Sequence, residues 1–342
     1  MATVYLHIGA FKTGTSFIQQ VLGDNADVLK RQGVLWPGGG GWGAQVQAVQ
    51  GLQGIADVPY SRWTDLVDEI NAWDGDRALV SMEFLSFATP EQIEKAVETL
   101  AGHRIRIVLA LRDLGRVLPA QWQESVQNGF FWDYREYVAA ASSPQARLTR
   151  PGRYFWSKHD WPRILRRWHK HLDAEDMILV TVPPAGSPSG LLWERFCQAV
   201  DLPADEFVMP PRANESLGAI SAEVMRRVAE QADLRGIDRR TQETIKWVLS
   251  KDILAGQKGD EPALLLPIKH QGWAKKRSKR IIEELRGFHP VVVGDLDDLM
   301  PVFPPLSPAV TVDPAALPLD DVLTKASYAL VAMSERLAQH RR

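Results

Sequence analysis

Short apolar runs rich in Val, Ile and Leu alternate along the chain with longer stretches whose apolar residues recur near one helical turn. Such runs are typical of parallel strands buried on both faces, and the stretches between them are typical of covering helices. We expect strands at Val4–Gly9, Val34–Trp36, Ala78–Met82, Ile105–Leu111, Met177–Val182 and, as the weakest signal, Val291–Val293. The sequence therefore predicts an α/β architecture with a central, mostly parallel sheet flanked by helices.

The C-terminal third is predicted to be largely helical. Ser216 is expected to cap a helix whose apolar residues share one face, namely Leu217, Ile220, Val224 and Val228. A proline-dense stretch, Pro301–Pro318, leads to a last amphipathic helix that ends in Arg341 and Arg342. This helix either docks on the body of the protein or serves an oligomer contact.

Length and net charge limit the domain organisation and the class of protein. The 342 residues correspond to about two average domains, although single α/β domains with insertions also reach this size. We divide the chain into an α/β domain with a helical C-terminal part at residues 1–310 and a proline-rich stretch with a helix at residues 311–342. The 40 Lys and Arg against 42 Asp and Glu give a net charge of -2, which argues against a surface built for nucleic acid.

The chain carries no targeting signal that we recognise. The single cysteine, Cys197, excludes an intramolecular disulfide and a Cys-rich metal site, and it fits a reducing compartment. The N-terminus lacks the basic region of a signal peptide, and no stretch approaches the roughly 18 apolar residues of a membrane helix. We therefore expect a cytoplasmic protein.

The loop after the first expected strand reads HIGAFKTGTS, from His7 to Ser16, and a helix is expected to begin near Ser16. A loop of this kind directs backbone N–H groups and the positive end of the helix toward one point, where phosphate-like oxygens bind. Gly9 and Gly14 permit the turns, and their spacing imitates a Walker A motif. However, Thr15 stands where a nucleotide triphosphatase carries lysine, and the lysine lies inside the loop at Lys12.

The run Lys12-Thr13-Gly14-Thr15-Ser16 resembles the 5′-phosphosulfate loop of sulfotransferases that use 3′-phosphoadenosine 5′-phosphosulfate (PAPS). The His-Ile-Gly lead at His7 and the later Gln19 resemble the bacterial branch of that family. The resemblance implies a P-loop-like three-layer fold, PAPS as sulfuryl donor with PAP as product, and no metal. It implies that Lys12 stabilises the leaving phosphate oxygen and that the terminal oxygens are bound by Thr13, Gly14, Thr15 and Ser16. A plain glycine turn with incidental hydroxyls is the alternative.

A second part of the nucleotide site is expected at the end of IRIVLALRD, where Arg112 follows an apolar strand at the edge that binds ligands in α/β folds. In the resembled family this arginine binds the 3′-phosphate, with a serine eight residues later. Here that position is Ala120, and the candidates to replace the serine are Arg116, Gln121 and Ser125. The alternative is a surface arginine paired with Asp113 or another acid.

Glu83 is the candidate general base. It follows the apolar run ALVSM directly, so it should stand at the carboxyl edge of the sheet. Family members carry a histidine or glutamate near the end of the corresponding strand, and Ser81-Met82-Glu83 resembles the Ser-x-Glu arrangement of bacterial relatives. The alternative is a glutamate that tethers a loop or pairs with Arg112 or Lys12.

The acceptor side is less specific. The aromatic-rich segments Trp122–Tyr134 and Arg153–Trp161 either line an acceptor pocket or pack under loops, and aromatic faces suit sugars, phenols and lipid headgroups alike. The sequence thus predicts a PAPS-dependent sulfotransferase acting on a hydroxyl or amine of a carbohydrate, lipid or small molecule. The alternatives are a P-loop kinase or nucleotide hydrolase, which the missing lysine after Gly14 disfavours, and a non-catalytic nucleotide-binding protein, which Ala120 keeps open.

Overall fold

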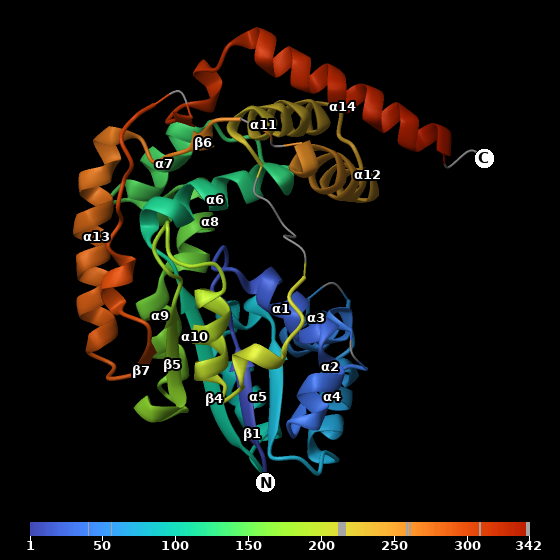
Figure 1. Ribbon diagram of the computed structural model, residues 1–342, viewed down its shortest axis with the longest axis vertical. Coiled ribbons are helices and arrows are strands. Elements are labelled where there is room, and N and C mark those ends of the chain that lie inside the picture. Colours follow the sequence, from blue (N-terminus) through green and yellow to red (C-terminus); the bar gives the residue numbers. More distant parts are fainter. Residues whose placement is uncertain are drawn as a thin grey trace. The chain divides into compact units, whose positions relative to one another are not determined.

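The computed structural model describes residues 1–39, 41–55, 57–210, 217–257, 259, 261–307 and 309–339, and Figure 1 shows it as a ribbon. The chain divides into two compact units. Unit 1 comprises Met1–Asp113, Ser157–Pro211 and Arg277–Met300, and unit 2 comprises Leu114–Trp156, Arg212–Lys276 and Pro301–Arg342. Each unit is assembled from segments that are distant in the sequence.

Unit 1 is built on a six-stranded sheet in the order β2-β3-β1-β4-β5-β7, in which neighbouring strands run parallel. This confirms the predicted α/β architecture with a mostly parallel central sheet. The strands begin and end within two residues of the expected runs, at β1 (Thr3–His7), β2 (Val34–Leu35), β3 (Arg77–Ser81), β4 (Arg104–Leu111), β5 (Met177–Thr181) and β7 (Val291–Val293).

The register of the sheet brings the predicted site segments to one edge. His7 at the end of β1 pairs with Ser81 of β3 on one side and with Val108 of β4 on the other. Because parallel strands end at a common edge, the segments that follow β1, β3 and β4 emerge side by side. These segments carry the loop, Glu83 and Arg112.

Helices cover the sheet and supply the core of unit 1. Ile18 and Leu22 of α1 (Thr15–Asp24) and Phe196 of α10 (Leu191–Ala199) are fully buried against strand residues such as Tyr5 and Ile178. The other helices of unit 1 are α2 (Ala26–Arg31), α3 (Trp42–Gln53), α4 (Ser61–Asn71), η1 (Glu83–Phe87), α5 (Pro90–Thr99), α9 (Trp161–Trp168), η3 (Ala174–Asp176), η4 (Ala204–Glu206) and η7 (Leu296–Leu299).

Local sequence explains where these helices begin. Thr89 caps α5, because its hydroxyl accepts a hydrogen bond from the backbone N–H of Gln92 while the Gln92 side chain accepts one from the N–H of Thr89. Pro90 at the first helical position lacks the N–H that would otherwise need a partner.

Two further helices, α8 (Arg150–His159) and α13 (Ile268–Arg286), have residues in both units, because the division of the chain falls within each of them.

Unit 2 is mainly helical, as expected for the C-terminal third. Its helix α11 (Ala219–Leu234) packs on α6 (Leu114–Gln127) and on α14 (Leu319–Gln339). The expected N-cap Ser216 and the terminal Arg341 and Arg342 lie outside the described residues. The remaining elements are α7 (Tyr134–Ser142), η2 (Ala146–Leu148), α12 (Arg239–Thr244), η5 (Ile245–Leu254), η6 (Ala255–Gln257), η8 (Pro314–Ala316) and the paired strands β6 (Ala263–Leu264) and β8 (Val310–Thr311).

Candidate functional site

The loop between β1 and α1 contains several residues with left-handed backbone angles. Gly9, Lys12 and Gly14 all adopt left-handed φ angles, of 97°, 62° and 93°. Residues in this region turn successive N–H groups toward the inside of the loop. Glycine reaches such angles at no steric cost, whereas Lys12 adopts its angle against the usual preference of an L-residue.

The N-terminus of α1 directly follows this loop. Gly14 is its N-cap, no side chain caps the helix, and the first turn carries no acidic residue. The positive end of the helix is therefore not neutralised by a side chain of this turn. It lies directly after the left-handed residues of the loop.

The hydroxyls of Thr13 and Thr15 brace the loop. Thr13 Oγ1 and Thr15 Oγ1 both donate to the carbonyl of Ala10, at 2.6 and 3.1 Å, and both residues are buried. Ser16 is exposed on the first turn of α1. Among the predicted hydroxyl ligands, the two threonines thus use their hydroxyls to hold the loop closed.

Glu83 lies against the loop. A Cβ atom placed on Gly9 would lie 3.0 Å from the Glu83 Cβ and 3.3 Å from its Cα, so the two backbones are in close contact. The buried Gln19 on α1 donates through Nε2 to Glu83 Oε2 at 3.2 Å and to the carbonyl of Ser81 at 3.0 Å. These bonds fix the carboxylate of Glu83 at the carboxyl edge of β3.

Arg112 joins the same group of residues. It follows β4, is partly buried, and donates from Nη1 to the backbone carbonyl of Lys12 at 3.2 Å. A guanidinium has a planar set of donors suited to phosphate oxygens. In this structure one of these donors supports the left-handed Lys12, so Arg112 lies beside the loop.

His7 is a buried histidine of the sheet. It is fully buried, its Nδ1 lies 2.7 Å from Ser81 Oγ, and its ring lies edge-on to Phe196. Burial lowers the pKa of His7 to about 3. His7 is therefore neutral at pH 7 and supports the loop through packing and hydrogen bonding.

The sequence did not single out Lys158, which the structure brings to the loop. Lys158 is only 8% exposed, and its Nζ lies 5.5 Å from the ring centre of Phe11 and 5.3 Å from that of Phe87. The two rings stack at 4.9 Å. Burial lowers the pKa of the neighbouring His159 well below its usual value, and the positive charges of Lys158 and Lys12 lower it further.

The segment Arg153–Trp161, in which the sequence shows no clear periodicity, mostly forms helix α8. Its large aromatic residues Phe155, Trp156 and Trp161 are buried, as are Trp122 and Tyr134 of the other aromatic segment. These five side chains therefore pack in the interior, which favours the packing alternative for them. No local signal in the sequence marks Lys158, because the rings of Phe11 and Phe87 that it contacts are far away along the chain.

Arg116 and Gln121, the other predicted nucleotide ligands, lie on α6 in unit 2. Gln121 is fully buried and hydrogen-bonds Tyr154. Burial is the main cause that raises the pKa of Tyr154 to about 12, followed by the charge of Glu124. Ala120, where the resembled family has serine, lies beside Gln121 on the same helix.

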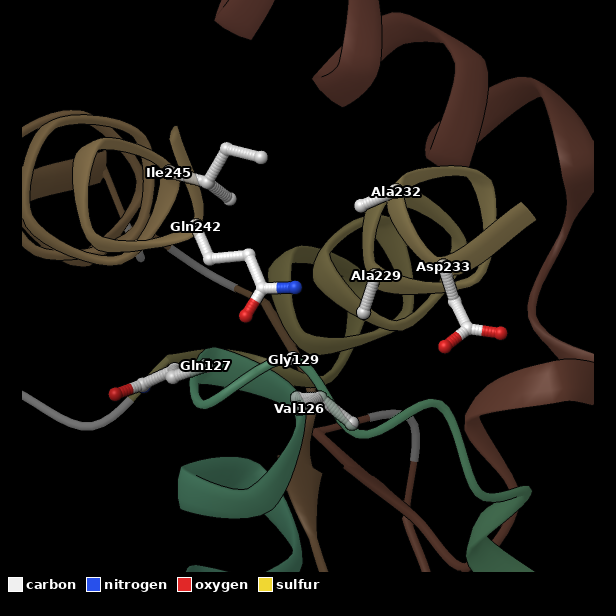
Figure 2. A pocket seen from close by; sticks show the side chains of 8 residues that line it. All are labelled: Val126, Gln127, Gly129, Ala229, Ala232, Asp233, Gln242 and Ile245. Atoms are coloured by element: carbon white, nitrogen blue, oxygen red, sulfur yellow. The ribbon is translucent and has the colours of Figure 1, made fainter. Parts of the chain in front are cut away.

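A small cavity lies in unit 2 between α6, α11 and α12 (Figure 2). Its volume of about 30 Å³ suffices for one or two water molecules and not for a nucleotide. It contains none of the predicted site residues, and its lining consists of Val126, Gln127, Gly129, Ala229, Ala232, Asp233, Gln242 and Ile245.

Comparison with known proteins gives no family. No protein-family model matches the sequence, and no match was found among curated proteins or solved structures. Within the described ranges, no three His, Cys, Asp or Glu side chains are grouped to hold a metal ion. In the same residues, no helix is both long enough and apolar enough to cross a membrane.

Proposed function

We propose that this chain is a PAPS-dependent sulfotransferase with a P-loop-like fold that acts in the cytoplasm. The observation that carries the proposal is the convergence of an uncapped helix end, a left-handed lysine, a carboxylate and a guanidinium at the edge of a parallel sheet. The order of the strands, with β1 between β3 and β4, supports it, because this order brings all of these groups together.

The residues at the loop suit a phosphosulfate group. Backbone N–H groups from Thr13 to Ser16 would hold its terminal oxygens without a formal charge at each contact. Lys12 would hold the bridging oxygen, and Arg112 would bind the 3′-phosphate of the nucleotide. When bound, PAPS supplies an activated sulfuryl group for transfer to an oxygen or nitrogen of the acceptor.

Glu83 and Lys12 have separate roles in this proposal. Glu83 takes the proton of the acceptor hydroxyl or amine, and Gln19 keeps its carboxylate in place for that purpose. Lys12 stabilises the negative charge that develops on the leaving phosphate oxygen. We include Lys158 in the donor site, because its buried ammonium lies beside Phe11, the neighbour of Lys12.

The acceptor is proposed to be a carbohydrate, lipid or small molecule with a hydroxyl or amine. A kinase or nucleotide hydrolase would need lysine at Thr15, and the structure has the side chain of Thr15 turned to the carbonyl of Ala10. The residues of the loop therefore favour sulfuryl transfer over kinase or hydrolase activity. A nucleotide-binding protein without turnover would use the same loop and would not need Glu83.

Turnover tests the proposal directly. Purified protein is incubated with PAPS and with each of a phenol, a monosaccharide and an alkyl amine, and PAP release is followed by chromatography. We expect acceptor-dependent release for the wild type and at least about a hundredfold slower release for Glu83→Gln. Binding of PAP with no release for any acceptor would instead indicate a non-catalytic protein, and Glu91→Gln on the exposed surface of α5 serves as the control.

A further inference from the structure

Helix α14 of unit 2 carries a row of exposed leucines. Leu319, Leu323, Leu330 and Leu337 are 55%, 54%, 70% and 60% exposed, although leucines this open on one helix are unusual for a surface in water. The last three are spaced by seven residues, so successive leucines drift by only about 20° around the helix. We refer to these four side chains as the leucine row.

A different face of α14 holds the helix on unit 2. Val322 and Ala329 are buried, and α14 packs on α11 and η5. Figure 1 shows α14 beside α11. Lys325 on this face pairs with Glu261 at 2.8 Å and donates to the carbonyl of Gln257. The contacts that hold α14 on unit 2 therefore leave the leucine row exposed.

We propose that the leucine row pairs with the same row of a second copy of this chain, with the two helices antiparallel. A narrow stripe with a seven-residue repeat is the pattern of a helix seam between two helices. Antiparallel pairing brings Leu319 and Leu323 to the level of the partner's Leu337 and leaves Leu330 near the centre of the contact.

The charges on α14 favour the antiparallel direction. A parallel pair would bring Asp320 and Asp321 of both copies together, whereas an antiparallel pair keeps these acidic turns apart. Arg336, at the level of the partner's acidic turn, is paired with Asp252 of its own copy at 3.9 Å. A membrane surface fits less well, because amphipathic membrane helices are rich in Lys and Arg. Among its described residues, α14 instead carries more acidic than basic side chains, with Asp320, Asp321 and Glu335 against Lys325 and Arg336.

The area is sufficient for a reversible dimer. With somewhat more than half of each leucine exposed, the row would bury on the order of 400 Å² per copy, which gives about 800 Å² in total before neighbouring side chains are counted. This total is below the roughly 1,000 Å² that a stable interface needs, so we expect a weak dimer that dissociates on dilution. The inference does not depend on the proposed sulfuryl transfer.

Sedimentation velocity of the full chain over a concentration series tests the pairing. We expect the wild type to shift from 38.3 kDa toward twice that mass as concentration rises. Leu330→Glu should raise the dissociation constant at least about tenfold, and Leu337→Glu provides a second variant near the helix end. Leu148→Glu, at a leucine of unit 2 that is 79% exposed and outside the row, should leave dimerisation unchanged.

Two results would overturn the pairing. One is a wild type that stays monomeric at all concentrations, including a monomer that floats with phosphatidylcholine–phosphatidylglycerol vesicles, which would assign the row to a membrane. The other is a dimer that Leu330→Glu and Leu337→Glu leave intact, since its interface would then lie elsewhere. Circular dichroism of each variant confirms that the helices remain folded.

Discussion

The guanidinium of Arg112 donates a hydrogen bond to the backbone carbonyl of Lys12, at 3.2 Å from Nη1. The bond joins the end of β4 to Lys12 in the β1–α1 loop. Lys12 has a left-handed φ of 62°, an angle that residues other than glycine rarely adopt. In the proposed function, a loop held in this way would not need to rearrange to bind the phosphosulfate, which would lower the entropy cost of binding. Arg112 therefore supports the loop as well as carrying a positive charge.

Lys12→Ala and Lys12→Gly separate the backbone role of Lys12 from its charge. Both variants lack the ammonium, so PAPS turnover should fall at least about a hundredfold in each. Glycine adopts φ 62° without strain, and we expect the glycine variant to be about 1 kcal/mol more stable than the alanine variant. Urea unfolding measures the difference, and equal stabilities would show that the left-handed angle is not maintained in solution.

Gly9→Ala should damage both the fold and the site. The new Cβ would require a left-handed residue at φ 97° and would meet Glu83 at 3.0 Å. We expect a loss of about 1–3 kcal/mol in the free energy of unfolding. We also expect that adding Glu83→Gln to this variant lowers turnover less than Glu83→Gln does in the wild type. Gly102→Ala, where a Cβ would meet nothing within 4 Å, is the matched control and should unfold like the wild type.

Acid should destabilise unit 1 through His7. Its folded pKa of about 3 lies below the unfolded value of about 6.5, so the unfolded chain takes up the proton first between these values. The free energy of unfolding therefore decreases as the pH falls through this window, by about 2 kcal/mol for His7 between pH 7 and 5. His7→Gln should lack this contribution.

Urea unfolding of both proteins at pH 7 and pH 5 measures the effect. Since His159 is also buried with a lowered pKa, both proteins should retain some acid sensitivity. The quantity that matters is the difference between the two pH dependences. Identical pH dependences would contradict the assignment of a buried, neutral His7.

The strands and the loop could be predicted from sequence because their signals are local. Continuous apolar runs mark β4 and β5 wherever the strands lie in the sheet, and two glycines with an interior lysine mark the loop. The position of Glu83 followed from the rule that parallel strands end at one edge. Its contact with Gly9 is consistent with that rule, while the catalytic role remains a prediction.

Lys158 could not be predicted, because its environment is made by residues far away in the sequence. Helix α8 buries Lys158 and His159 on the same side as Phe155 and Trp156, and polar residues in such a face are not recognised as buried from the sequence. The same applies to Gln19, whose importance rests on a hydrogen bond to Glu83 across 64 residues. Such contacts follow from packing and not from spacing.

Calorimetric titration with PAP in metal-free buffer tests the central claim most directly. We predict micromolar binding by the wild type and at least about tenfold weaker binding by Arg112→Ala. Arg104→Ala, at the other end of the same strand, should bind like the wild type, since its guanidinium pairs with Glu175 and Asp176. Absence of PAP binding, or a clear preference for ATP with Mg²⁺, would contradict the proposed sulfotransferase.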